Sequence, residues 1–388
     1  EIYTLSLHDA LPIWSAGNNK NSLAIAFGVA AVWFGAHVGG GFATGNQTVQ
    51  YFVKFGWTAA IVPVFVMALL AWIYYQAVLI AKNHDVHSYD KMAEKLYEPY
   101  GRIGKVIFDI GYLVLTLVGV GIAIAGSGEL FKDVFGLNYY IGIILTGFIF
   151  FLLTIFGAKL VRNASSAITL LILICLVVLL IPGIRSGSGN LSRIFAEKTV
   201  NGSFGQVLWH ALLYAGFQSL VAGSLVSASQ TLTDKSLCKK FAVVGFVLNA
   251  VMTVLCAIMI LGYMPEVAVN KLPILTIAKS QGLALLTTAY SCILFLAFVS
   301  TGVGVVFGFV ARYENAILKS TSLSIRRAVI SAIAIILSTT MAVTGITKLV
   351  AVGYGWLGRF CIFVVILPLA IIAPIKNAKF AKEHPEVE

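Results

Sequence analysis

The chain has 388 residues, of which 59% are hydrophobic and only 11% are charged, and its mean hydropathy is +0.93. Soluble domains carry about 25% charged residues, so this composition excludes a soluble enzyme, a disordered chain and a disulfide-linked scaffold. The net charge of +11 does not indicate a nucleic-acid partner, because no basic run interleaved with aromatic residues accompanies it. We therefore expect an all-α polytopic membrane protein whose partners are the lipid bilayer and a small-molecule substrate.

The chain divides into a short leader and one long hydrophobic region. Residues 1–14 lack an initiating Met and the basic start of a signal peptide, so we expect them to be a non-native leader. Residues 15–388 are expected to form a single transmembrane domain with ten spans, each long enough for a hydrocarbon core of about 30 Å. The predicted spans are 21–44, 57–81, 103–131, 138–157, 164–185, 204–230, 240–263, 283–311, 326–346 and 349–375.

The loops between these spans differ in basic residues. With the N-terminus placed in the cytoplasm, eighteen of the 27 Lys and Arg residues fall on the inner side and eight on the outer side, while Arg359 lies within a span. Cytoplasmic loops carry an excess of Lys and Arg. The sequence therefore predicts a multi-pass protein of the cell inner (plasma) membrane with both termini in the cytoplasm.

Glycines interrupt two spans at corresponding positions. The first span contains the contiguous glycines Gly39, Gly40 and Gly41, which disfavour a helix and predict an unwound segment. A weaker interruption, 214–219, lies in the sixth span; close packing of a Gly/Ser face is its alternative explanation. Five spans cover 21–185 and five cover 204–375, so the second half must be inverted. This organisation is typical of inverted-repeat transporters with a site at the two breaks.

Oxygen-bearing groups cluster in the eighth span. Ser300 and Thr301 follow Ala297 by three and four residues, so a carbonyl and two hydroxyls share one helix face. Hard cations prefer such oxygen ligands. The alternative is that both hydroxyls bond back to carbonyls of their own helix.

This pattern resembles the LeuT-fold transporters of the amino acid–polyamine–cation superfamily. The resemblance implies a sodium ion, as coupling ion rather than cofactor, held by Ala297, Ser300 and Thr301 with carbonyls of the broken first helix at Gly35 and Val38. It implies a LeuT-like 5+5 inverted repeat with broken first and sixth helices.

The chain also resembles the uncharacterised YkvI-type membrane proteins over most of 21–375. The shared features are the glycine motif at 39–45, Ala-Gly-Ser-Gly at 125–128 and Gly-Tyr-Gly-Trp-Leu-Gly at 353–358. Gln47 and Gln218 stand where members of that group often carry Glu and Asn, so a proton-carrying role of that Glu does not transfer to this chain.

Several polar residues fall at the predicted breaks or inside spans. His37 lies in the first break, where it either contacts substrate, carries a coupling proton or bonds to freed backbone. The sixth-span residues Tyr214, Gly216, Phe217 and Gln218 are expected to bind substrate together with His37, Gly39, Gly40 and Gly41.

Three charged side chains have no solvent to face. In the resembled fold, Glu129 and Arg359 border the outer vestibule, as a gate pair or as an Arg anchor for a substrate carboxylate. The alternatives are that Glu129 lies at the interface and that Arg359 snorkels. Asp109 is expected to pair with a nearby Lys or Arg.

Together these features predict a sodium-coupled secondary transporter of a small organic solute, such as an amino acid or related amine, working by alternating access. A proton-coupled or uncoupled carrier using His37 or Glu129, a channel and a membrane-bound sensor remain open. No catalytic motif is present, so we do not expect an enzyme.

Overall fold

The computed structural model describes residues 22–314 and 320–385, without the side chains of 157–166 and 311, and the predicted leader lies outside this range. The expected all-α membrane architecture is confirmed: nine described helices are long and apolar enough to cross a membrane. A tenth apolar helix, α2, has only 16 residues, so the count of ten spans stays a prediction. The helices are α2 Ser22–His37, α3 Gly40–Ala43, α4 Asn46–Tyr51, α5 Val62–His84, α6 Tyr89–Leu96, α7 Gly101–Phe135, α8 Tyr139–Leu152, α9 Ala158–Ser186, α10 Ser188–Glu197, α11 Phe204–Gln218, α12 Ala222–Ala228, α13 Lys235–Leu261, α14 Pro273–Ser280, α15 Ala284–Tyr313, α16 Leu323–Ala342, α17 Ile346–Lys348, α18 Tyr354–Cys361 and α19 Ala373–Glu383.

Polar residues at the ends of the apolar segments set where several helices begin. Asp234 caps α13 by accepting a hydrogen bond of 2.8 Å from Leu237 N. A capping box starts α11: the Ser203 hydroxyl accepts from Gln206 N, and the Gln206 side chain accepts from Ser203 N. Such caps satisfy amides that would otherwise be unpaired where the helix enters the membrane.

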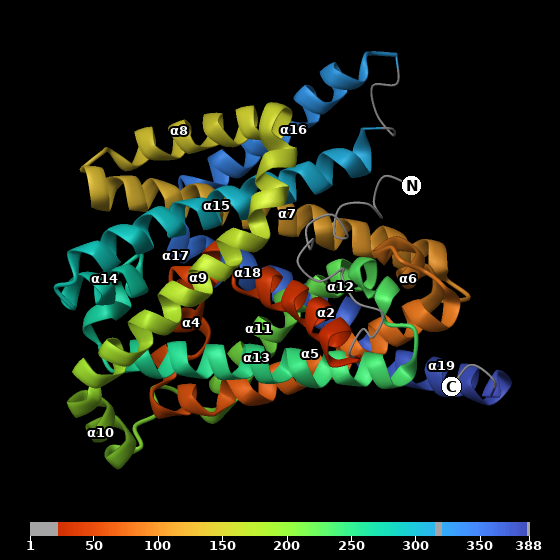
Figure 1. The fold of residues 1–388 in the computed structure, drawn as a ribbon, viewed down its shortest axis with the longest axis horizontal. Helices are drawn as coiled ribbons and strands as arrows, with labels where there is room; N and C mark the ends of the chain where they lie inside the picture. The colour runs from red at the N-terminus through yellow and green to blue at the C-terminus, as the bar shows by residue number, and fades with distance from the viewer. Residues whose placement is uncertain (1–21, 315–319, 386–388) are drawn as a thin grey trace.

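The long helices form two groups (Figure 1). The first contains α2, α5, α11 and α13, with α13 packed along both α2 and α5. The second contains α7, α8, α15 and α16, with α7 packed against the other three. α9 runs between the groups and contacts α15 and α13, whereas α18 contacts α11 and α7.

Aromatic side chains distinguish the interior from the outer face of this assembly. Trp33, Tyr74 and Tyr214 are fully buried between helices. Large apolar side chains such as Phe65, at 69% exposure, and Phe148, at 58%, cover the outside. Since a soluble protein would not expose so much apolar surface, the outer face is suited to lipid.

Candidate functional site

The first apolar segment is interrupted in the middle of the molecule. α2 ends at His37, α3 begins at Gly40, and the two residues between them are not helical. A second bend follows at Gly45, whose φ of 83° favours glycine. The prediction that three contiguous glycines are unwound is wrong for Gly40 and Gly41, which lie within α3.

Three glycines at or near the interruption are explained by close packing. A methyl group at Gly40 or at Gly126 of α7 would overlap the ring of Phe298 from α15. A methyl group at Gly41 would overlap the Gln47 side chain in the same way. Because Gly40 of α3 and Gly126 of α7 have no side chains, the ring of Phe298 fits between these two helices and α15.

The interruption leaves carbonyl oxygens without helical partners. The ladder of α2 ends with the bond from Val38 N to Phe34 O, at 2.9 Å. Within the described residues, no backbone amide donates to the carbonyl of Gly35 or of Val38. Carbonyls freed in this way need a partner outside the helical ladder, such as a side-chain donor or a cation.

α15 brings the Thr301 hydroxyl to this interruption. Gly40 N donates to Thr301 Oγ1 at 3.3 Å, and a Cβ on Gly39 would lie 3.3 Å from the same oxygen. Ala297 is buried one turn earlier, and Ser300 is half-buried. The structure thus places one predicted ligand of the eighth span, Thr301, against the start of α3.

His37 joins three helices through buried hydrogen bonds. Its Nδ1 lies 2.7 Å from Asn249 Oδ1 of α13, and its Nε2 lies 2.7 Å from the Tyr214 hydroxyl of α11. Asn249 Nδ2 donates to Gly245 O at 2.8 Å, so the amide oxygen must face the imidazole. His37 therefore carries its proton on Nδ1 and accepts at Nε2 from Tyr214.

Asn249 was not predicted from the sequence as a site residue. It is fully buried, and it is the only asparagine of α13. A single buried amide in an apolar span was the signal that could have identified it, since such groups need a partner. That partner, His37, is 212 residues away in the chain.

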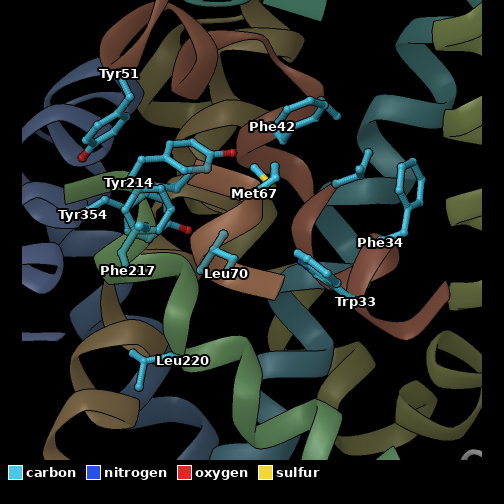
Figure 2. Packing of buried hydrophobic residues seen from close by; sticks show 14 of the residues in the cluster. Trp33, Phe34, Phe42, Tyr51, Met67, Leu70, Tyr214, Phe217, Leu220 and Tyr354 are labelled. Atoms are coloured by element: carbon cyan, nitrogen blue, oxygen red, sulfur yellow. The ribbon is translucent and has the colours of Figure 1, made fainter. Parts of the chain in front are cut away.

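Aromatic rings line the sixth-span side of the site (Figure 2). Phe217 stacks on Tyr354 with centroids 4.3 Å apart, and Tyr214 lies 5.0 Å from Phe217. Tyr51, at the end of α4, lies 5.3 Å from Phe217 and donates to Val350 O at 2.8 Å. The predicted residues Tyr214 and Phe217 thus belong to a wall that Tyr51 and Tyr354 complete.

The sixth span differs from the expected break. The chain stays helical, and only a 3-10 turn, Ser219–Val221, separates α11 from α12. A methyl group at Gly216 would overlap Gly358 O of α18, so the absence of a side chain at Gly216 lets α11 and α18 pack closely. The carbonyl of Gln218 accepts a hydrogen bond of 2.6 Å from the Tyr74 hydroxyl, which ties α11 to α5.

The predicted outer gate pair is wrong for this conformation. The Arg359 guanidinium lies 4.9 Å from the ring centroid of Trp356, which is 67% exposed, and no ion pair joins Arg359 to Glu129 in the described chain. Glu129 instead interacts electrostatically with Lys132 and Lys271. Arg359 extends along its own helix to an exposed ring one turn away, in agreement with the snorkelling alternative.

Asp109 belongs to an ion cluster at the opposite end of α7. Arg312 Nη2 of α15 lies 2.8 Å from Asp109 Oδ2, and the Tyr89 hydroxyl donates to Asp109 Oδ1 at 2.6 Å. Asp90 of α6 adds a second carboxylate, 3.1 Å from Lys105 Nζ. The structure therefore pairs Asp109 with Arg312, in the kind of structural pair that we expected.

Comparison with known sequences gives one informative relative. No family model matches the chain. The uncharacterized membrane protein YkvI of Bacillus subtilis (strain 168) is 26% identical over 229 residues. That match covers 58% of this chain and 63% of the relative, so the chain spans less than two thirds of that protein.

Several solved transporters share the architecture described above. MhsT in complex with L-phenylalanine superposes with a TM-score of 0.61 at 17% identity, covering 91% of this chain and 97% of MhsT. This chain has the LeuT fold. A manganese transporter of Eremococcus coleocola (TM-score 0.55, 15% identity, 94% and 83% coverage) and a Na⁺-coupled sialic acid symporter (0.52, 12%, 91% and 98%) share the LeuT fold. These neighbours are transporters, not enzymes.

Proposed function

We propose that this protein is a sodium-coupled secondary transporter of a small organic solute, such as an amino acid or related amine. The observation that carries the proposal is the interruption between α2 and α3, which faces Thr301 of α15 at 3.3 Å. Solved LeuT-fold neighbours include a Na⁺-coupled symporter and a protein bound to an amino acid, which supports both parts of the proposal.

The proposed sodium site joins the two helix groups. Carbonyl oxygens of Gly35 and Val38 come from α2 and the residue after it, while Ala297, Ser300 and Thr301 come from α15. A sodium ion bound by both sets would favour the conformation in which α2 and α15 lie close. An ion shifts a conformational equilibrium only through such a difference in affinity between states.

The proposed substrate site lies beside this interruption. His37 and the backbone of Gly39 would contact the polar end of the solute, and the wall that includes Tyr214 and Phe217 would contact its apolar or cationic part. Aromatic faces attract ammonium groups as well as apolar groups. Gln218 lies in the same stretch of α11, and Gly40 and Gly41 border the site from α3.

The topology belongs to the same proposal. We place both termini in the cytoplasm, with α6 and the Asp109 cluster on the inner side, in the cell inner (plasma) membrane. The halves 21–185 and 204–375 would be the inverted repeats. The group containing α2, α5, α11 and α13 would rock against the group containing α7, α8, α15 and α16.

Uptake into proteoliposomes tests this function. Solutes that stabilise the purified protein against heat in the presence of sodium would be selected first. We expect the selected solute to accumulate when an inward sodium gradient is imposed, and to accumulate at most weakly with potassium in its place. If uptake of the solute is the same with and without the sodium gradient, transport is not coupled to sodium. If the protein binds the solute but does not transport it, the result would indicate a sensor.

The His37 network favours proton coupling as a second candidate. Protonation at Nε2 would turn the Tyr214 hydroxyl from donor to acceptor, so it would alter the contact between α2 and α11. In that case a pH gradient alone would drive uptake, and His37→Gln would abolish the drive while solute binding persists. Uptake driven by sodium at constant pH, in both the original protein and His37→Gln, would reject this candidate.

A further inference from the structure

The short helix α12 is separated from the rest of its span at both ends. The 3-10 turn Ser219–Val221 divides it from α11, and a second 3-10 turn, Ser229–Thr231, follows it. α12 packs against α2, α5 and α6 (Figure 1). Because 3-10 turns within a longer helix mark hinges, this arrangement lets α12 move as a unit relative to α11.

Two tyrosines hold the turn between α11 and α12. The Tyr74 hydroxyl of α5 donates to Gln218 O at 2.6 Å, and the Tyr112 hydroxyl of α7 donates to Leu220 O at 2.7 Å. Tyr74 belongs to the same helix group as α11, whereas Tyr112 belongs to the other group. The bond from Tyr112 to Leu220 O therefore connects the two helix groups at this turn.

The backbone of α12 comes very close to Tyr112. A Cβ on Gly223 would overlap the Tyr112 hydroxyl oxygen, and it would lie 3.1 Å from Tyr89 Cβ. A side chain at this position would displace the hydroxyl from Leu220 O or push α12 away from α7. The absence of a side chain at Gly223 thus allows the bond to form.

The ring of Tyr112 is connected to the Asp109 ion cluster. It stacks on the ring of Tyr89, the first residue of α6, with centroids 4.4 Å apart and an angle of 23° between the planes. The Tyr89 hydroxyl donates to Asp109, and the Arg312 guanidinium lies 5.4 Å from the centroid of the Tyr89 ring. Since Asp109 and Arg312 are themselves paired, the cluster holds Tyr89 in place against Tyr112.

We propose that Tyr112 and Tyr89 form a latch that holds α12 against α7, and that breaking the bond to Leu220 O releases α12 to move as a unit. α12 follows the wall residues Tyr214 and Phe217 along the chain and contacts α6 at the end of the molecule that holds the Asp109 cluster. In the proposed transporter, its movement would open the inner end of the solute site. That role rests on the proposed function, whereas the latch itself needs neither the solute nor sodium.

Hydrogen–deuterium exchange of the full-length protein in detergent, measured by mass spectrometry without solute or sodium, tests the latch. Tyr112→Phe removes the bond to Leu220 O and keeps the stacked ring. We expect the amides of α12 to exchange at least about threefold faster in this variant, as the loss of one hydrogen bond predicts, and those of α11 to stay unchanged. Tyr139→Phe is the matched control, because it removes a similar bond, of 2.6 Å to Ala342 O, between α8 and α16.

Gly223→Ala provides an independent variant. Ala stabilises an ordinary helix relative to Gly and would slow its exchange. Here the added methyl group would overlap the Tyr112 hydroxyl, so we expect faster exchange of α12 instead.

Three results would overturn the latch: unchanged exchange of α12 in Tyr112→Phe, slower exchange of α12 in Gly223→Ala, or equal acceleration of α11 and α12. Acceleration of α12 in Tyr139→Phe would overturn it as well. Because the exchange is measured without solute and sodium, these results would leave the proposed function standing. Faster exchange of α12 alone, together with uptake that does not respond to sodium, would support the latch and contradict sodium coupling.

Discussion

At the scale of single residues, the hydrogen bonds of His37 explain why polar groups stand in the apolar spans. The imidazole is saturated by Asn249 and Tyr214, so none of the three buried groups is left unpaired. The sequence could predict that His37 mattered, because it lies next to the contiguous glycines. It could not predict Asn249, since the pairing depends on how α2 and α13 meet in space.

The substitution Asn249→Ala tests this network. It removes the acceptor of His37 Nδ1 and leaves a small cavity, so we expect a loss of about 1–2 kcal/mol in stability. Thermal unfolding in detergent measures the loss. Thr253→Val is the control, because Thr253 is equally buried one turn later but bonds only to its own helix. Equal effects of the two substitutions would contradict a special role for the network.

At the scale of helices, glycines determine which elements can touch. Gly216 and Gly358 bring the backbones of α11 and α18 into contact, and Phe298 fills the space that Gly40 and Gly126 leave. The sequence predicted that glycines would be informative in these spans. It did not distinguish unwinding from close packing, since that depends on the opposing helix.

Gly216→Ala tests the contact between α11 and α18. The added methyl group would overlap Gly358 O, and we expect a loss of about 1–3 kcal/mol in stability from overpacking. Gly205→Ala in the same helix meets no atom closer than 3.8 Å and should have little effect. If Gly216→Ala unfolds at the same temperature as Gly205→Ala, the helices do not pack as described.

The ion cluster between α6, α7 and α15 gives a prediction about pH. Burial raises the pKa of Asp90, but hydrogen bonds from Ser88 and Lys105 and the charges of Lys105 and Arg312 outweigh it and hold the pKa at about 2. Because the pKa of Asp90 in the folded protein lies below the ordinary value of 3.8 for an Asp carboxyl, the stabilisation is complete above about pH 4. It is lost as the pH falls towards 2.

Asp90→Asn should therefore lower the melting temperature at pH 7 by more than it does at pH 3. Melting curves of both proteins at the two pH values measure the difference. The control is Asp85→Asn, whose carboxylate is 95% exposed and should matter little at either pH. If Asp90→Asn lowers the melting temperature by the same amount at pH 7 and at pH 3, the cluster does not hold Asp90 in its charged form.

At the scale of the whole molecule, the fold was predictable from two properties that are averaged over long segments. Hydropathy indicates the membrane spans, and the number of basic residues in each loop indicates on which side of the membrane it lies. The two groups of helices and their shared LeuT architecture agree with that prediction. The outer gate was not predictable, because the direction of the Arg359 side chain depends on its exposed neighbour Trp356. The proposed sodium site lies where Gly40 of α3 donates to Thr301 of α15, beside the carbonyls of Gly35 and Val38.

Equilibrium binding of radioactive sodium to the purified protein tests that place most directly. We expect saturable binding that excess unlabelled sodium displaces and potassium does not. Ser300→Ala combined with Thr301→Val should weaken it at least tenfold, because two oxygen ligands are lost. Ser300→Thr combined with Thr301→Ser keeps both hydroxyls and should retain binding. Sodium binding that is unchanged in the first variant, or absent from the unmodified protein, would contradict the proposed sodium site.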